Sequence, residues 1–157
     1  MSAQDADVAP PGQDRPMEIL LVEDNEGDVL LASEAFKTLR VPYTLSVASD
    51  GEQALAMLHR AEPYQDQPRP DFILLDLNLP KRDGREVLET IKRDPDLRGI
   101  PVVVLSGSRA EEEIAHSYAL YANAYIVKPV HFDRFKEIVS AIEAFFFSVV
   151  ALQRSAG

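Results

Sequence analysis

The sequence contains no cysteine, which excludes disulfides, thiolate metal sites and cysteine nucleophiles. It also has no apolar run long enough to span a bilayer, and its N-terminus lacks the basic-then-apolar order of a signal peptide. We therefore expect a cytoplasmic protein with no membrane partner. Basic residues are outnumbered, because 16 Lys and Arg face 26 Asp and Glu. The formal charge of -10 would repel phosphate backbones, so we expect no nucleic-acid partner.

The chain of 157 residues is long enough for one domain with a substantial core. Residues 1–16 are polar and rich in Pro, Asp and Gln, with too few apolar groups to offset the entropy of ordering them. We predict that this segment is a disordered tail. The domain itself is expected to cover residues 17–145, and residues 146–157 are expected to extend the last helix.

From Met17 onward, short apolar runs alternate with segments of helical spacing. Helix starts are indicated by capping boxes, in which Ser49, Asp83 or Ser108 is followed three residues later by Glu. Apolar strands that alternate with helices indicate a parallel sheet covered on both faces. The predicted fold is α/β, a five-stranded parallel sheet in a doubly wound three-layer sandwich. The five predicted strands are residues 18–22, 43–47, 72–76, 101–105 and 124–127.

The carboxyl ends of these strands carry the chemically active residues, and ligands bind at that edge of such a sheet. Asp76 ends the third strand, where a buried carboxylate requires a partner. The first strand ends in Glu23 and Asp24, the fourth in Ser106 and the fifth in Lys128. Because each negative charge disfavours ionisation of the next, three neighbouring carboxylates favour a bound cation. Mg²⁺ prefers hard oxygen ligands and is commonly held by carboxylates together with phosphate oxygens.

Each of these residues taken singly has a structural explanation. An Asp at the end of a strand commonly caps the following turn, a Ser can belong to a turn, and a Lys can be an exposed charge. Their joint placement on one edge, as acid, acid, hydroxyl and amine, favours a site that handles phosphate beside a metal ion.

Four segments together resemble the signature of the receiver domain of two-component response regulators. They are LLVEDNEGD (20–28), FILLDLNLPKRDG (72–84), VVVLSGS (102–108) and AYIVKP (124–129). The resemblance implies a flavodoxin-like fold and a single-domain regulator that accepts a phosphoryl group on Asp76 from the phosphohistidine of a sensor histidine kinase. Such a protein signals by a conformational change. It is not an enzyme, apart from autocatalytic phosphotransfer and dephosphorylation.

The resemblance also implies the metal ligands. Asp24 and Asp76 would bind Mg²⁺ directly, the backbone carbonyl of Asn78 would be a third ligand, and Glu23 would act through water. Many receivers have Asp at the position of Glu23, although Glu is common there as well.

Further roles follow from the same resemblance. Ser106 and Lys128 would contact phosphoryl oxygens, and the peptide bond from Lys128 to Pro129 would be cis. Ser106 and Tyr125 would form the switch, because the hydroxyl moves toward the phosphoryl group and the aromatic ring turns inward behind it. The residues expected to tune hydrolysis of the acyl phosphate are Asn78, Gly107 and Ser108.

The last predicted helix, from about Phe132 onward, is more apolar than one core face requires. An uncovered apolar stripe suggests an interface, and our hypothesis is a homodimer through the fourth helix, the fifth strand and the fifth helix. The alternative is a monomer whose tail folds back. The apolar positions are Phe135, Ile138, Ile142, Phe145 and Val149 on one stripe, Val139, Phe146 and Val150 on a second, and Phe147 elsewhere.

Within the family, the run from 79 to 108, the Pro-rich loop at 62–70 and the aromatic final helix resemble the stand-alone regulators that partner bacterial phytochromes. That resemblance implies a light-regulated histidine kinase as the phosphodonor.

Three alternatives stay open. A phosphatase of the haloacid dehalogenase type also uses a strand-end Asp with Mg²⁺ and Lys, but it usually needs a second Asp where this chain has Asn78. A Rossmann-type nucleotide module needs a Gly-rich turn after the first strand, where this chain has acidic residues. The third alternative is a regulator that only drains phosphate from a shared kinase.

Overall fold

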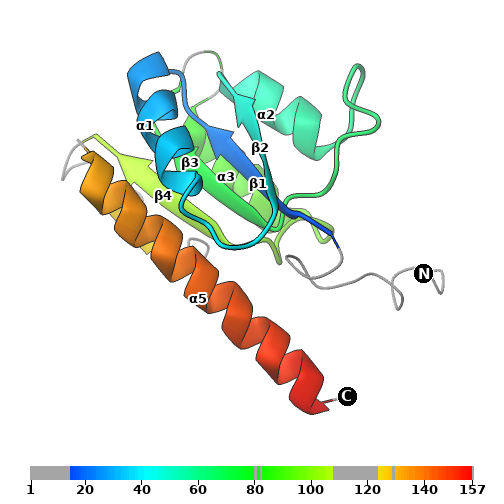
Figure 1. The fold of residues 1–157 in the computed structure, drawn as a ribbon. Coiled ribbons are helices and arrows are strands. Elements are labelled where there is room, and N and C mark those ends of the chain that lie inside the picture. The colour runs from blue at the N-terminus through cyan, green and yellow to red at the C-terminus, as the bar shows by residue number, and fades with distance from the viewer. Residues whose placement is uncertain (1–14, 80, 82, 108–123, 129, 157) are drawn as a thin grey trace.

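The computed structural model describes residues 15–79, 81, 83–107, 124–128 and 130–156, without the side chains of 106, 124, 125 and 146–156. Most of the predicted tail, the capping box at Ser108 and the cis bond to Pro129 lie outside these residues. From β1 to α3 and on to β4, strands and helices alternate along the chain (Figure 1). The elements are β1 Met17–Val22, α1 Glu26–Phe36, β2 Tyr43–Ala48, α2 Gly51–Leu58, β3 Phe72–Asp76, α3 Gly84–Arg93, β4 Val102–Ser106, β5 Ala124–Val127 and α5 Phe132–Ala156.

The five strands form one parallel sheet in the order β2-β1-β3-β4-β5, which confirms the predicted architecture. From β1 the chain moves outward to β2 and then returns past β1 to β3. The strand order therefore reverses between β1 and β3, and ligands of doubly wound sheets bind at this kind of position. The register aligns Val22 with Leu75 and Asp76 with Leu105, so neighbouring strands end at nearly the same level.

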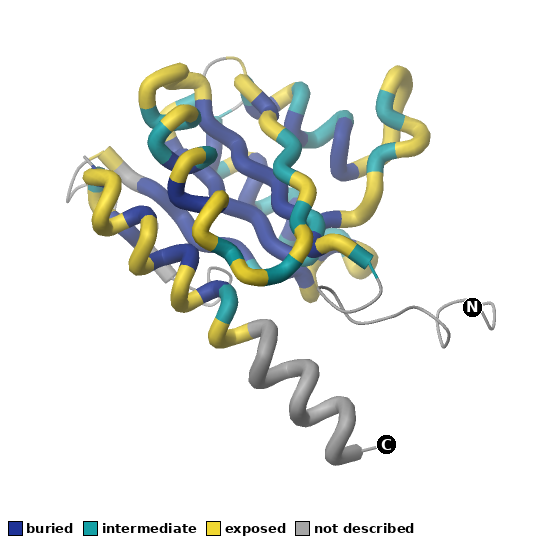
Figure 2. Tube along the Cα trace, viewed as in Figure 1, coloured by how far each residue is buried: buried dark blue, intermediate teal, exposed yellow. Residues whose placement is uncertain are grey.

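Two hydrophobic clusters hold the sheet between its helices (Figure 2). Alternate residues of a strand point to opposite faces, and here both faces are covered. On one face Leu21 and Leu74 pack with α1 and α5, and on the other Leu20 and Leu75 pack with α2 and α3. Burial on both sides explains why the central strands are continuously apolar and lack a polar alternation.

The helix starts are set by short polar side chains, with one correction to the prediction. Asp83 caps α3 as expected, and its side chain accepts a hydrogen bond from Arg85 N. The capping box at Ser49 is wrong by one residue, because Asp50 caps α2 and accepts from Gln53 N at 2.7 Å. Ser49 instead donates its backbone N–H to Gln53 Oε1 at 2.8 Å. Both residue types are good caps, and an ionised Asp gains more from the positive end of the helix.

Gly84 lets α3 begin directly against the end of β3. A Cβ atom at Gly84 would collide with the carbonyl oxygen of Asp76 and would lie 2.5 Å from Leu77 Cα. These are backbone atoms, which cannot move aside without displacing the strand end itself.

Gly84→Ala is therefore expected to destabilise the protein by about 2 kcal/mol, because the overpacking exceeds the helical propensity gained. The midpoint of thermal unfolding should fall by roughly 5–10 °C. Gly99→Ala is the matched control, because its nearest neighbour, an Arg69 nitrogen, is 4.0 Å from the added carbon. Equal midpoints for the two variants would contradict the close approach at Gly84.

Helix α5 continues well past the sheet (Figure 1). Its 25 residues span about 37 Å at 1.5 Å per residue, roughly twice the length of a five-residue strand. Phe135, Ile138, Val139 and Ile142 are buried, whereas Phe145 is 48 % exposed. Among the residues described, no helix combines the length and the apolar composition that crossing a membrane requires.

Candidate functional site

The ends of β1 and β3 bring the predicted carboxylates together. Glu23 and Asp76 are both only 1 % exposed, whereas the neighbouring Asp24 is exposed. Each of the three offers an oxygen, and these oxygens lie within 4.8 Å of one another. The side chains come from two adjacent strands at the reversal of strand order.

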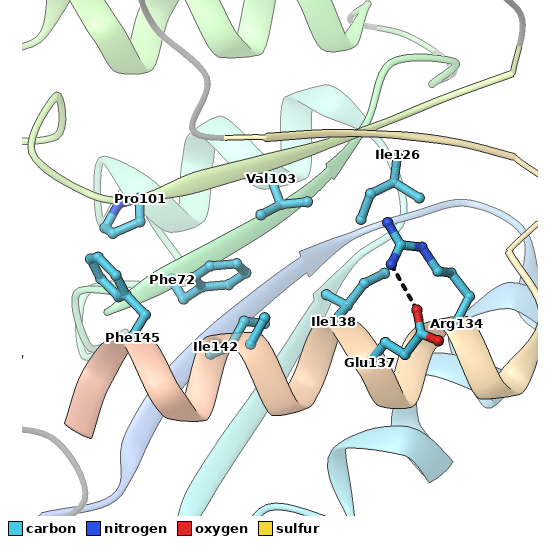
Figure 3. Close-up of a pocket in the computed structure, with 10 residues that line it drawn as sticks. Phe72, Pro101, Val103, Ile126, Arg134, Glu137, Ile138, Ile142 and Phe145 are labelled. Carbon is cyan, nitrogen blue, oxygen red and sulfur yellow. Dashed lines mark hydrogen bonds and ion pairs between the residues drawn. The ribbon is translucent and has the colours of Figure 1, made fainter. Parts of the chain in front are cut away.

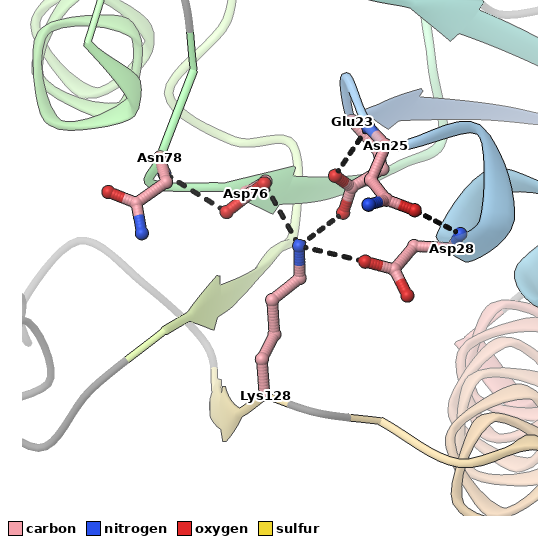
Figure 4. A network of polar contacts seen from close by, with 6 residues as sticks. All are labelled: Glu23, Asn25, Asp28, Asp76, Asn78 and Lys128. Carbon is pink, nitrogen blue, oxygen red and sulfur yellow. Dashed lines mark hydrogen bonds and ion pairs between the residues drawn. The ribbon is translucent and has the colours of Figure 1, made fainter.

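The ammonium of Lys128 compensates the negative charge of these carboxylates (Figure 4). Its Nζ lies 2.8 Å from Glu23 Oε2, 3.0 Å from Asp76 Oδ2 and 3.2 Å from Asp28 Oδ2. An ammonium has three donor hydrogens, so three carboxylates match its capacity. Because β4 lies between β3 and β5, the long Lys side chain reaches past the end of β4 to Asp76.

The two oxygens of Asp76 have different partners. Oδ1 accepts a hydrogen bond from the backbone N–H of Asn78 at 3.0 Å, and Oδ2 accepts one from Lys128. The turn after β3 therefore holds one oxygen, while Lys128, which directly follows the edge strand β5, holds the second. These contacts keep the carboxylate in one orientation inside a largely buried site.

Burial and neighbouring charges shift the pKa values of Glu23 and Lys128. Burial raises the pKa of Glu23 to about 7, the contact with Lys128 works against this, and the charge of Asp76 adds to it. For Lys128, desolvation by burial lowers the pKa, but the close contact with Glu23 and the charges of Asp76 and Glu23 raise it above its ordinary value. The ammonium is thus charged at neutral pH.

The carboxylates fit a hard divalent cation. Glu23 Oε1 accepts from Asn25 N at 3.1 Å, whereas the buried Oε2 has no aligned hydrogen bond within the part of the chain that the structure describes. Its approach to Lys128 is a charge contact. An oxygen with a free lone pair beside two further carboxylates suits Mg²⁺, which prefers oxygen ligands.

Other predicted residues are placed in part. Asn78 is exposed two residues after the end of β3, and Gly107 is exposed directly after β4. Ser106 ends β4 opposite Val127, so its backbone lies at the same edge. The side chains of Ser106 and Tyr125, and all of Ser108, lie outside the described residues.

Asp28 is a site residue that the sequence interpretation missed. Asn25 caps α1 and accepts from Asp28 N at 2.9 Å. Only three residues separate β1 from the helix, so its first turn stays at the sheet edge. The available signal was this spacing, an Asn cap followed by an Asp three residues later and immediately after a strand-end acid.

Comparison with known proteins agrees with this geometry. The family model of the response regulator receiver domain matches residues 19–140, and the chain belongs to that family. Receiver domains bind Mg²⁺ at this acidic pocket, and Glu23, Asp24 and Asp76 fit such a site. The expectations for family, fold and cofactor are confirmed, and the phosphatase and Rossmann alternatives lose their support.

Several of the similar proteins are response regulators associated with phytochromes. Response regulator Rcp1 of Synechocystis sp. is 45 % identical over 137 residues, which are 87 % of this chain and 93 % of the relative. The structure of its Mn²⁺-bound form has a TM-score of 0.74 with 46 % identity and covers 83 % of this chain and 94 % of that one. The phosphorylated cyanobacterial phytochrome response regulator RcpA gives a TM-score of 0.75 with 49 % identity, covering 85 % and 95 %. The bacteriophytochrome response regulator AtBRR gives 0.68 with 44 % identity, covering 79 % and 90 %.

Proposed function

We propose that Asp76 is the phosphoacceptor of this receiver domain and takes its phosphoryl group from the phosphohistidine of a sensor histidine kinase. The observation that carries the proposal is the buried Asp76 carboxylate at the reversal of strand order, with one oxygen held by Asn78 N and the other by Lys128. In the transfer, a bond forms between an Asp76 oxygen and phosphorus while the phosphorus–nitrogen bond of the donor breaks. The electron pair of that bond stays on the imidazole.

The residues of this chain position the reactants and neutralise charge. A carboxylate attacks an anionic phosphoryl group poorly, so the Lys128 ammonium lowers the barrier by stabilising the developing negative charge. Asp24, Asp76 and the Asn78 carbonyl would hold Mg²⁺, with Glu23 acting through water. When bound, Mg²⁺ supplies further positive charge beside the phosphoryl oxygens.

Several roles complete the proposal. Ser106 would contact the phosphoryl group and act with Tyr125 as the switch that changes the conformation. Asn78, Gly107 and Ser108 would influence how fast water removes the group, so phosphorylation would be transient. The domain bounds of 17–145, a cytoplasmic location and the lack of a nucleic-acid partner stay predictions.

We test the function with a small phosphodonor and Mg²⁺. The protein should gain one phosphoryl group per chain, detected by intact-mass spectrometry, and should then lose it spontaneously. A phosphomonoester such as p-nitrophenyl phosphate should not be turned over. Catalytic release of nitrophenol without a phosphorylated protein would instead support the phosphatase alternative.

A light-regulated kinase is the proposed phosphodonor. Support comes from the relatives, because RcpA is a phytochrome response regulator and AtBRR a bacteriophytochrome response regulator. In this proposal the light signal reaches the protein through its kinase.

We also propose a homodimer through β5, α5 and the predicted fourth helix, which lies outside the described residues. Support comes from an apolar groove of about 360 Å³ between α5 and the sheet, in which Phe72, Val103 and Ile126 face Ile142 and Phe145 (Figure 3). An ion pair between Arg134 and Glu137 lies at one end of this groove. The C-terminal part of α5 extends past the sheet (Figure 1), and its sequence from 145 to 152 is rich in apolar residues, which suits packing against a second copy.

Phe145→Glu is expected to shift the protein from dimer to monomer in sedimentation at micromolar concentration, because it places a charge in the groove. Leu30→Glu is the matched control, because Leu30 is 62 % exposed on α1, away from this groove, and its replacement should leave the dimer intact. A wild-type protein that sediments as a monomer with and without phosphorylation would refute the homodimer.

A further inference from the structure

The first turn of α1 delivers a fourth carboxylate to the phosphoacceptor site. Asp28 Oδ2 lies 3.2 Å from Lys128 Nζ, and the Asp28 side chain is 28 % exposed. Figure 4 shows the Lys128 ammonium surrounded by the carboxylates of Asp28, Glu23 and Asp76. The Asn25 cap fixes the position of Asp28, because Asn25 Oδ1 accepts the Asp28 N–H.

Asp28 differs from the other carboxylates in having no second task. Among the described residues, the group that could hold a metal ion consists of Glu23, Asp24 and Asp76. Lys128 therefore shares Glu23 and Asp76 with the proposed cation, and Asp76 also with the phosphoryl group. Asp28 is a partner that the ammonium keeps when both of the others are engaged.

The flexibility of the Lys128 side chain makes this remaining partner important. Its four-carbon stem has many rotamers, and an ammonium that loses its anchors returns readily to water. Lys128 also reaches across the end of β4, because it follows the edge strand β5. Without Asp28, the ammonium would either compete with the cation for Glu23 and Asp76 or leave the site.

We propose that Asp28 is a positioning residue, which keeps the Lys128 ammonium at Asp76 while a metal ion and a phosphoryl group occupy the other carboxylates. This inference rests on the proposed phosphoacceptor function. A simpler role for Asp28 is to stabilise the positive end of α1, as acidic residues in a first helical turn do. Glu26 lies in the same turn, is exposed, and isolates this simpler role.

The test is a double-mutant cycle with two readouts. Asp28→Ala should slow phosphorylation by a small phosphodonor at saturating Mg²⁺ by roughly tenfold, the loss expected for one charge-assisted hydrogen bond. Glu26→Ala should change the rate by less than about twofold, as for an exposed charge. In a Lys128→Ala background, Asp28→Ala should have no further effect, because Asp28 acts through the lysine.

The second readout is Mg²⁺ binding to the unphosphorylated protein, measured by titration calorimetry. When Lys128 is present, Asp28→Ala should weaken Mg²⁺ binding several-fold, because the ammonium then competes with the ion for Glu23 and Asp76. In the Lys128→Ala background, Asp28→Ala should weaken Mg²⁺ binding by less than about twofold. Equal weakening in both backgrounds would make Asp28 a metal ligand or a general charge and would overturn the proposal. Equal effects of Asp28→Ala and Glu26→Ala would overturn it too. If no variant is phosphorylated, the proposed function fails, but the calorimetric cycle still decides the role of Asp28.

Discussion

Asp76→Asn is expected to take up no phosphoryl label from a small phosphodonor, whereas the wild-type protein takes up one per chain. The amide has the shape of the carboxylate and can still accept the Asn78 N–H, but it has no anionic oxygen to attack phosphorus. Removal of a nucleophile lowers rates by many orders of magnitude, so a loss of at least about 10³-fold is expected. The measurement is intact-mass spectrometry or radiolabel retained on the protein.

The unfolding midpoint of Asp76→Asn serves as the control for correct folding of this variant. Glu23 and Asp76 repel each other, and the Asp76 charge contributes to the raised pKa of Glu23. Replacing Asp76 by a neutral residue relieves this repulsion, so the unfolding midpoint should not fall. A folded Asp76→Asn protein that still accepts label at the wild-type rate would show that the phosphoacceptor is a different residue.

Lys128→Ala is expected to slow phosphorylation by roughly 10²–10³-fold, the usual cost of removing a group that stabilises charge in the transition state. Two effects combine. The phosphoryl group loses its ammonium partner, and Glu23 loses the contact that lowers its pKa, so Glu23 becomes more protonated near neutral pH. The rate of label uptake at fixed donor and Mg²⁺ concentrations measures the change.

Lys92→Ala is the matched control for this experiment. Lys92 is also a partly buried lysine, but its ammonium binds the carbonyl oxygens of Arg98 at 3.2 Å and Ile100 at 3.1 Å, remote from the β3 end. Its removal should cost about 1 kcal/mol of stability and leave the phosphorylation rate unchanged. Equal rates for Lys128→Ala and the wild type would remove Lys128 from the mechanism.

The strands were predictable because burial on both faces of the sheet requires a short, continuous apolar run in the sequence. The predicted strands at 72–76 and 124–127 coincide with β3 and β5. Those for β1 and β2 are one residue short at one end, and the strand predicted at 101–105 is shifted by one residue from β4. Helix starts were less certain, as α2 shows. Ser49 and Asp50 are adjacent and both suit a cap, so local pattern alone does not choose between them.

The site residues were predictable as types at strand ends, but their pairing was not. Glu23 and Asp24 are neighbours in the chain, yet one is buried against Lys128 and the other is exposed. Successive residues point in opposite directions, and which of them faces the site depends on how the end of β1 packs. Asp28 was missed because its role depends on a contact with Lys128, 100 residues later in the chain.

The amino-acid sequence by itself determined the alternation of strands and helices, the family, and the acids and lysine that end the strands. It could do so because burial and helix capping act between residues a few positions apart. The tertiary structure decided the strand order, and with it which carboxylates share the ammonium. Lys128 and Asp76 are 52 residues apart, and only the packing of β3, β4 and β5 places their charged atoms at 3.0 Å.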